Sequence, residues 1–227
     1  MLNRLQESFE GERRFLDTAS HELRTPLAAL KTELDLALSR PRSLAEAQAA
    51  LHSASEETDR LAQLADDLLV LSRAHRGRLP VHRAATSLAA VVGAARTHVA
   101  ARAEAAGVQL RATAPAEWVH VDETRLRQAL DNLLDNALRH TPSGGVVQVQ
   151  ATVEDGAVRV VVDDSGPGFP PDAAAMTLSQ PGRLATGFGL GLAIVSAVAA
   201  GHGGGVTTIT RPEGGGRVIV TLAEATD

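Results

Sequence analysis

The sequence predicts two kinds of fold in one chain of 227 residues: a helical hairpin over residues 1–75 and an α/β sandwich over residues 81–227. In the first part, leucine and alanine recur about every 3.5 residues, a spacing typical of helices that pack in coiled-coil-like bundles. Residues 76–80 break this period and are predicted to form a linker. Beyond them, β-rich runs alternate with helical patterns, which predicts an open sheet covered by helices on one side.

The helical part is predicted to contain two long helices joined by a short turn. Residues 1–14 form an incoming helix that continues into the first one, and Pro41 ends it. Ser43 is a predicted N-cap of the second helix, over residues 44–74, and Glu46 completes a capping box. The predicted seam positions are Leu16, Leu23, Leu27, Leu30 and Leu34 in the first helix and Leu44, Ala47, Leu51, Ala54, Thr58, Leu61, Ala65 and Leu68 in the second.

The hairpin predicts a partner for its own apolar surface. Two such helices cannot bury both apolar stripes between themselves, whereas two hairpins would close a four-helix bundle. We therefore expect a homodimer. A hairpin that serves only as a scaffold, without chemistry, is the alternative for this part.

The first helix carries a candidate reactive site in the stretch Ser-His-Glu-Leu-Arg-Thr-Pro-Leu, residues 20–27. His21 falls just off the apolar seam, so its imidazole is expected to face solvent. Glu22 flanks the ring, and Thr25 lies one turn further on the same face. Pro26 is expected to bend the helix just beyond. The alternative is a surface histidine without a role.

The α/β part is predicted to contain three helices and six strands. Asp122 and Gly107 are the predicted N-cap and C-cap residues of two of these helices. The predicted helices cover residues 87–106, 123–140 and 190–200. The predicted strands cover residues 108–112, 118–121, 146–153, 157–162, 206–210 and 217–222.

Two polar segments of this part carry side chains that a purely structural chain would not need. Asn132 and Asn136 are four residues apart and project from one face of their helix, where an amide oxygen suits Mg²⁺. Asp164, before Gly166 and Gly168, can accept a hydrogen bond from an exocyclic amine while the glycines let the backbone approach a ligand. The alternatives are a solvated helix face and a simple Asp/Gly/Pro turn.

A third segment places Gly187, Gly189 and Gly191 at alternate positions that run into an apolar helix. Free backbone N–H groups at such a helix start can hold phosphates. It is not a P-loop, because no Gly-Lys-Ser/Thr follows. Glycine-rich loops before helices are common, so this segment is a weak signal by itself.

Composition excludes several classes of function. The net charge of −5 makes nucleic-acid binding a poor hypothesis. The absence of cysteine excludes disulfides and thiol chemistry. No run of about 18 apolar residues and no secretory signal over residues 1–14 are present, so we expect a cytoplasmic segment.

Taken together and in this order, the motifs resemble the catalytic core of bacterial sensor histidine kinases of two-component systems. Residues 20–27 resemble the H box, 132–136 the N box, 164–168 the G1 box and 187–192 the G2 box. The resemblance implies a dimerisation and histidine-phosphotransfer hairpin over residues 1–75. It also implies an ATP-binding domain of the type shared with gyrase, heat-shock chaperone and mismatch-repair ATPases.

The resemblance implies a role for each motif residue of the hairpin. His21 would be the phospho-acceptor, and Glu22 would accept the proton of the other ring nitrogen. The phosphoryl group would then pass to an aspartate of a response regulator docked on the hairpin. Glu22 and Thr25 would also support dephosphorylation of that regulator.

In the ATP-binding domain, the resemblance implies a site for ATP and Mg²⁺. Asn136 would bind Mg²⁺ and Asn132 the phosphates, while Asp164 would read the adenine amine. The other residues implied to bind the nucleotide are Arg139, His140, Gly166, Gly168, Gly187, Gly189, Gly191 and Leu192.

Three further expectations follow from the resemblance. Residues 171–186 contain no Phe, so the phenylalanine-rich F box of the family is missing and we expect an atypical lid. The incoming helix implies that the full-length protein is anchored in the bacterial cell membrane by segments preceding this chain. The main alternative is a degenerate kinase that acts as a regulator phosphatase or as a dimeric ATP-sensing scaffold. A binding module or an ATPase of the chaperone or topoisomerase type is disfavoured by the H-box stretch.

Overall fold

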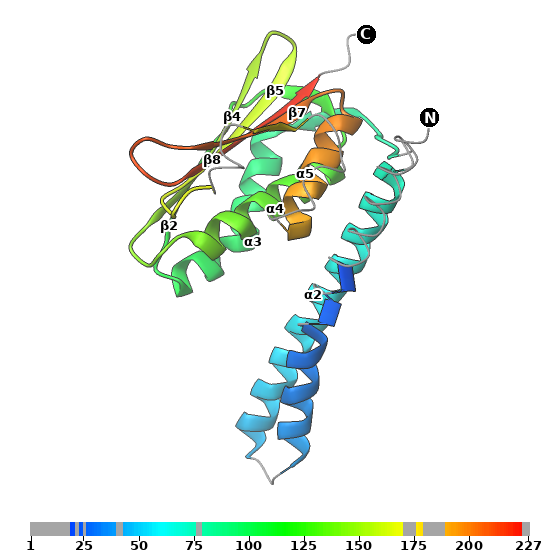
Figure 1. Cartoon of the computed structure of the whole chain (residues 1–227), viewed down its shortest axis with the longest axis vertical. Helices are drawn as coiled ribbons and strands as arrows, with labels where there is room; N and C mark the ends of the chain where they lie inside the picture. The colour runs from blue at the N-terminus through cyan, green and yellow to red at the C-terminus, as the bar shows by residue number, and fades with distance from the viewer. Residues whose placement is uncertain are drawn as a thin grey trace, which may run out of the picture.

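The computed structural model describes residues 19–20, 23–24, 26–39, 43–75, 79–169, 176–178 and 189–223. A helical hairpin extends as a long arm from an α/β domain, and the end of the hairpin opposite its turn lies against the helices of that domain (Figure 1). The helical and α/β parts therefore follow the predicted order along the chain.

The hairpin pairs a first helix, helical at residues 19–20, 23–24 and 26–38, with helix α2, Leu44–His75. The predicted capping box is present: Ser43 N donates to Glu46 Oε2 at 2.9 Å, and Glu46 N donates to Ser43 Oγ at 3.3 Å. Ser53 Oγ donates to Glu33 Oε1 at 2.8 Å and fixes the antiparallel register of the two helices.

Several large apolar side chains of the hairpin remain exposed in the single chain. Four of them occupy predicted seam positions, which is what a hairpin whose apolar stripe lacks a partner should show. The exposed leucines of the hairpin are Leu27, Leu34, Leu36, Leu38, Leu44, Leu51 and Leu69.

The α/β domain contains a six-stranded sheet in the order β2-β4-β5-β8-β7-β6. Strand β2 runs parallel to β4, and every other neighbouring pair is antiparallel. A separate two-stranded sheet pairs β1 with β3. The strands are β1 Ala84–Ser87, β2 Gln109–Thr113, β3 Trp118–Val121, β4 Val146–Glu154, β5 Ala157–Asp164, β6 Met176–Leu178, β7 Gly205–Thr210 and β8 Gly216–Ala223.

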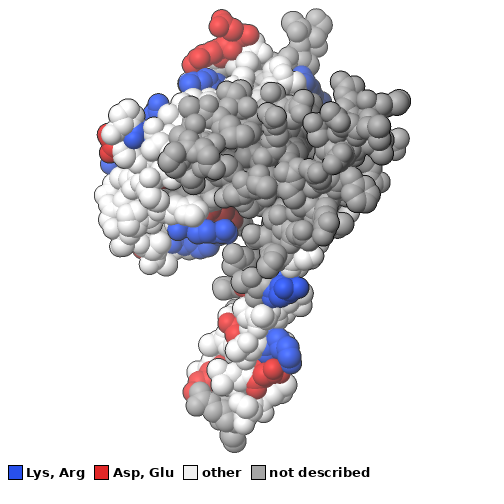
Figure 2. Space-filling view, viewed as in Figure 1, with Lys and Arg blue, Asp and Glu red and all other residues white. Residues whose placement is uncertain are grey.

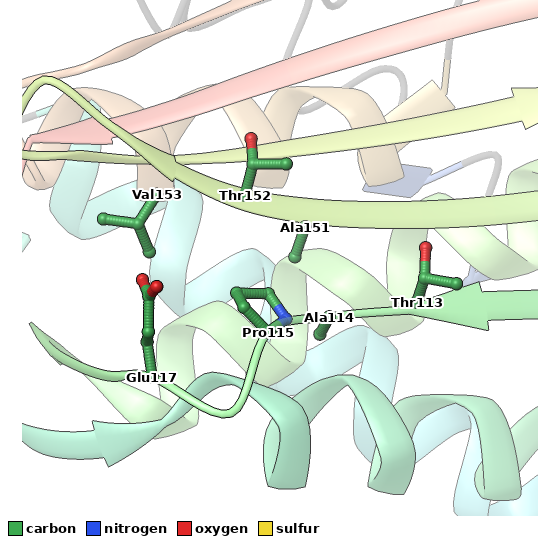
Figure 3. Close-up of a pocket in the computed structure, with 7 residues that line it drawn as sticks. All are labelled: Thr113, Ala114, Pro115, Glu117, Ala151, Thr152 and Val153. Carbon is green, nitrogen blue, oxygen red and sulfur yellow. The ribbon is translucent and has the colours of Figure 1, made fainter.

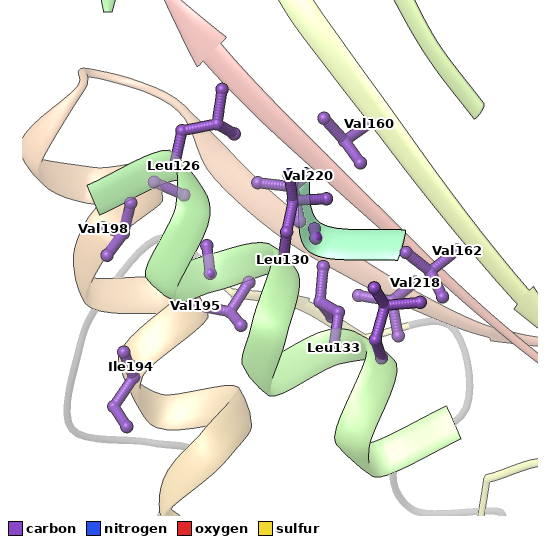
Figure 4. Close-up of a cluster of buried hydrophobic side chains, with 14 of the residues drawn as sticks. Leu126, Leu130, Leu133, Val160, Val162, Ile194, Val195, Val198, Val218 and Val220 are labelled. Atoms are coloured by element: carbon purple, nitrogen blue, oxygen red, sulfur yellow. The ribbon is translucent and has the colours of Figure 1, made fainter. Parts of the chain in front are cut away.

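Three helices cover one face of the sheet: α3 Leu88–Ala105, α4 Glu123–His140 and α5 Gly189–Gly201 (Figure 1). Ser87 caps α3 by accepting from Ala90 N, and Asp122 caps α4 by accepting from Arg125 N at 3.0 Å. The core lies between these helices and the sheet, with few aromatic side chains. Figure 4 shows its centre, where Leu126, Leu130 and Leu133 of α4 meet Ile194, Val195 and Val198 of α5 and Val160, Val162, Val218 and Val220 of the sheet.

The predicted fold class is confirmed, and most predicted elements agree with the observed ones to within two residues. Strands β1 and β6 were not predicted. Strand β1 reads Ala-Ala-Thr-Ser, a poor strand sequence, and its pairing with β3 depends on a contact more than 30 residues away. Strand β6 lies in the stretch expected to form the lid and pairs with β7 at the edge of the sheet.

On the face seen in Figure 2, lysine and arginine atoms form separate patches of limited size. Among the described residues, no helix has the length and apolar character needed to cross a membrane.

A buried histidine ties the connection after α2 to the core. The ring of His202 is fully buried, its Nδ1 contacts Val198 O at 2.9 Å, and its Nε2 accepts from Asp122 N at 3.1 Å. Arg83 Nη2 donates to the backbone oxygen of the same histidine at 2.9 Å. Burial, followed by the charge of Arg83, lowers the pKa of His202 below 6.5.

This histidine predicts that the domain loses stability in mild acid. Because the pKa of His202 is lower in the folded chain, the unfolded chain binds more protons at this residue in mild acid. The free energy of unfolding should therefore be unaffected by His202 above about pH 6.5 and should fall as the pH drops below it. Urea unfolding between pH 5 and 7.5 should show this slope. A reduced slope is expected in His202→Gln and an unchanged one in His52→Gln, whose side chain is exposed. A slope in His202→Gln equal to that of the wild type would contradict the assignment.

Candidate functional site

Helix α4 presents both predicted asparagines beside its buried apolar face. Leu126, Leu130 and Leu133 hold the helix on the core, and Asn132 and Asn136 are half-buried at its edge. Asn132 Nδ2 donates to Gln128 O at 3.0 Å, and its carbonyl oxygen makes no hydrogen bond with a residue that the structure describes. The side chain of Asn136 makes no hydrogen bond with any residue that the structure describes. Both amides can therefore serve a ligand at this edge.

The start of α5 lies directly against Asn132. A Cβ atom added at Gly191 would stand 3.0 Å from Asn132 Oδ1, so glycine allows the close approach of the two helices. Leu190 and Leu192 on either side are buried in the core, at 5% and 2% exposure. Any contact of Leu192 with a ligand would thus come from its backbone. Gly189 is the first residue of α5.

The turn after β5 forms the other wall of the site. Asp164 Oδ1 accepts hydrogen bonds from Gly166 N at 2.8 Å and from Gly216 N at 3.1 Å. A Cβ atom at Gly166 would lie 2.6 Å from His140 O, so this turn touches the last turn of α4. Gly168 adopts a φ of +80°, and the next residue bonds Thr210 of β7. The turn is therefore held from both sides.

These bonds define what Asp164 can offer a ligand. Its Oδ1 already holds two backbone donors, whereas Oδ2 makes no hydrogen bond with a described residue. A Cβ atom at Gly216 would lie 2.6 Å from that oxygen, so glycine keeps the approach to it open. Oδ2 is thus suited to accept a hydrogen bond from an amine.

The cationic end of α4 and its acidic side chains complete the electrostatics. Arg139 and His140 are exposed in the last turn. Burial raises the pKa of Asp131, a shift opposed by Arg127, whose Nε lies 2.9 Å from the carboxylate. Asp135 pairs with Arg102 of α3 at 2.6 Å. Both carboxylates near the asparagines are therefore neutralised by arginine, which lowers the repulsion of an anionic ligand.

The remaining predicted residues, His21, Glu22, Thr25 and Gly187, lie outside the described residues. Their described neighbours Ala19, Ser20, Leu23 and Arg24 are helical, in the first helix of the hairpin.

Three features of the site were not predicted. Gly216 holds the Asp164 carboxylate through its backbone N–H, and the run of three glycines at 214–216 is the sequence signal of this close backbone approach. Thr210 was read only as the end of a strand. The contact of Asp67 with Gln128 had no signal in the sequence, because the two residues are 61 positions apart and lie on different helices.

A hollow of about 330 Å³ lies elsewhere on the domain (Figure 3). Small uncharged side chains and Glu117 line it, from the end of β2 and from β4. It contains none of the predicted site residues. Because its lining contains a carboxylate and no cationic side chain, this hollow is a poor binding site for a polyanion.

The side chains at the α4 edge can supply one ligand to a metal ion but not a complete coordination shell. Within the described part of the chain, no group of three or more His, Cys, Asp or Glu side chains could hold a metal ion. The unbonded amide oxygen of Asn136 fits a hard cation that takes its other ligands from phosphate and water.

Two family models match the chain. Residues 12–77 match the His Kinase A (phospho-acceptor) domain. Residues 121–226 match the histidine kinase-, DNA gyrase B- and HSP90-like ATPase domain. The first match covers the hairpin. The second covers the α/β domain from the end of β3 onward, including α4, the β5 turn and α5.

Individual relatives agree with the two family models. The sensor histidine kinase CusS of Escherichia coli is 34% identical over 98% of this chain and 48% of its own length. The sensor protein CutS of Streptomyces coelicolor is 38% identical over 98% of this chain and 55% of its own length. The chain thus spans about half the length of the curated relatives it matches.

Among solved structures, full-length ShkA in complex with AMPPNP superposes with a TM-score of 0.65. The two are 28% identical over 93% of this chain and 46% of ShkA. The two domain matches occur in the order expected for one family, and the relatives align over both domains. The chain belongs to the sensor histidine kinases of bacterial two-component systems.

Proposed function

We propose that this chain catalyses ATP-dependent autophosphorylation of His21 and transfers the phosphoryl group to an aspartate of a response regulator. The observation that carries the proposal is the meeting of three separate segments at one edge of the domain. Asn132 touches Gly191, and the Asp164 turn touches the end of α4. The hairpin that contains the phospho-acceptor match packs against the same helices.

In this proposal, ATP lies between the β5 turn and the N-terminus of α5. Asp164 Oδ2 accepts from the adenine amine, while Gly166 and Gly168 shape the pocket around the base. Asn132, Arg139 and the backbone of Gly187, Gly189 and Gly191 hold the phosphates. The remaining contacts come from His140 near the base and the backbone of Leu192. The AMPPNP bound by ShkA supports a nucleotide site in this fold.

Asn136 would hold Mg²⁺, whose charge offsets that of the phosphates when it is bound. A ring nitrogen of His21 attacks the γ-phosphorus, and the bond from that phosphorus to the β,γ-bridging oxygen breaks. ADP leaves with the electron pair, and Glu22 takes the proton of the other ring nitrogen. Positioning and charge provide most of the rate enhancement in such transfers.

The organisation of the chain follows from the same proposal. Residues 1–75 form the hairpin, including the incoming helix over 1–14, residues 76–80 form the linker and residues 81–227 form the ATP-binding domain. The exposed leucines of the hairpin support a homodimer closed as a four-helix bundle. The names of the relatives as sensor proteins support a response regulator as partner and a full-length protein in the bacterial membrane.

Incubation of the chain with γ-labelled ATP and Mg²⁺ tests the kinase proposal. The label should become covalently attached, stable in alkali and lost in acid, as a phosphoramidate bond requires. Acid-stable label, or none, would exclude autophosphorylation on histidine and favour the alternative of a phosphatase or an ATP-sensing scaffold.

Phosphatase activity towards the regulator is a second proposed function, supported by the spacing of Glu22 and Thr25. Thr25→Ala should spare autophosphorylation, because Thr25 takes no part in the attack by His21, and should slow the release of phosphate from the phosphorylated regulator. Both rates can be followed with one labelled preparation. An equal loss of both activities would exclude this role of Thr25.

A further inference from the structure

A buried carboxylate, Asp67 of α2, joins the hairpin to the ATP-binding domain. Asp67 is 6% exposed. Its Oδ1 accepts a hydrogen bond of 2.7 Å from Gln128 Nε2 on α4 and one of 3.2 Å from Gln63 Nε2 on its own helix. The bond to Gln128 therefore crosses between the two parts of the chain.

The environment of Asp67 is unusual for an acidic side chain. In the described part of the chain, no lysine, arginine or histidine forms an ion pair with it. Burial raises the pKa of Asp67, and hydrogen bonds from Gln128 and Gln63 oppose that shift. A carboxylate buried among amides costs desolvation energy. It is therefore better suited to fix an orientation than to add stability.

The contact leads directly to the nucleotide site. The backbone oxygen of Gln128 accepts from Asn132 Nδ2 at 3.0 Å. Asn132 Oδ1 in turn faces Gly191 at the start of α5. Two successive contacts thus connect the hairpin to Asn132, which is proposed to hold the phosphates, and a third leads on to Gly191.

The register of the two hairpin helices shows where along the hairpin Asp67 lies. Glu33 and Ser53 are hydrogen-bonded across the two helices. Asp67 lies fourteen residues after Ser53, about 21 Å along α2, and Ala19 lies fourteen residues before Glu33 in the sequence. The antiparallel register therefore places Asp67 toward the same end of the hairpin as Ala19, which is 7% exposed and is one of the described helical residues before position 21.

Apolar contacts accompany the polar one. Val70 and Leu71, one turn further along α2, are each 3% exposed and belong to the same core cluster as α4 and α5. Such a contact is non-directional, so it holds the two parts together without fixing how they are turned. The hydrogen bond from Gln128 supplies the direction.

From these contacts we propose that Asp67 is a positioning residue for phosphoryl transfer. Through Gln128 it holds the ATP-binding domain on α2 with Asn132 at the end of the hairpin that contains the helical residues flanking the phospho-acceptor. This role rests on the autophosphorylation proposed above. Because Asp67 acts through Gln128, its loss should lower the rate of transfer and leave the affinity for nucleotide unchanged.

Substitutions in the 227-residue chain separate this role from a structural one. Asp67→Ala should lower kcat of autophosphorylation about tenfold, a change of about 1.4 kcal/mol in the barrier, with the Kd for AMPPNP within twofold of the wild type. Asp67→Asn should retain most of kcat, because its amide oxygen still accepts from Gln128. Gln128→Ala should match Asp67→Ala, and the double variant should lose no more than either. Asp66→Ala, an exposed neighbour, is the matched control.

An unchanged or raised kcat in Asp67→Ala would overturn the proposal, as would a loss of AMPPNP affinity equal to the loss of kcat. A second measurement does not depend on activity. The chain contains no cysteine, so spin labels can be placed on cysteines introduced at the exposed positions Ser55 and Glu104, and diluted with unlabelled chain.

The distance distribution between the labels should be narrow in the wild type and broader or shifted in Asp67→Ala. If the wild type takes up no phosphate, the kinase proposal fails and this distance alone decides whether Asp67 positions the domain. An unchanged distribution in Asp67→Ala then overturns the positioning role.

Discussion

Replacing His21 by glutamine should reduce covalent labelling by γ-labelled ATP to background, a loss of at least a hundredfold. Glutamine is similar in size and polarity, but its amide nitrogen has no free electron pair with which to attack phosphorus. The residue lies within the phospho-acceptor match over residues 12–77, between helical neighbours. The ATP site is formed by other elements, so the Kd for AMPPNP should not change.

The matched control is His52→Gln. His52 lies on α2, is exposed, and belongs to no motif, so this variant should be labelled like the wild type. Persistent acid-labile label in His21→Gln would assign the phospho-acceptor to another histidine. Loss of AMPPNP binding together with labelling would instead indicate that the variant is misfolded or that His21 serves the nucleotide site.

Replacing Asp164 by asparagine should weaken ATP binding 10- to 100-fold. Hydrogen bonds to charged groups contribute about 1.5–3 kcal/mol, which corresponds to that range. One oxygen of Asp164 holds Gly166 N and Gly216 N. If asparagine keeps those two bonds, its NH₂ group faces the adenine amine, donor against donor. Calorimetric titration with ATP and Mg²⁺ measures the effect.

Two comparisons make the test specific. Inosine triphosphate lacks the amine, so Asp164→Asn should abolish the preference of the wild type for ATP over it. Asp163→Asn removes the neighbouring carboxylate, which pairs with Arg217 at 2.6 Å, and should leave the Kd for ATP unchanged. Equal ATP affinities of Asp164→Asn and the wild type would exclude Asp164 as the residue that reads adenine.

Much of the fold could be predicted because its signals are local. Helix α4 was predicted with its observed bounds, since Asp122 caps one end and the run from Thr141 to Gly145 stops the other. The capping box of Ser43 and Glu46 was equally local. Strand β1 could not be predicted, because its four small residues become a strand only when β3 lies beside them.

The site divides in the same way. Each motif could be located in the sequence because its residues are neighbours in the chain, and the four motifs in order indicated the family although each was a weak signal by itself. The contacts of Gly191 with Asn132 and of Gly166 with His140 depend on how three elements pack, which no periodicity encodes. The contact of Asp67 with Gln128 was missed for the same reason. An aspartate in a long polar helix looks like a solvated side chain until its partner helix is in place.

The proposed nucleotide site brings together the α4 asparagines, the β5 turn and the start of α5. Titration of the isotope-labelled chain with AMPPNP and Mg²⁺, followed by NMR, tests it directly. The amides of Gly166, Gly191 and Gly216 and the side-chain amides of Asn132 and Asn136 should shift together and give one Kd. Shifts confined to the hollow around Glu117, or different Kd values for Asn132 and Gly166, would contradict it.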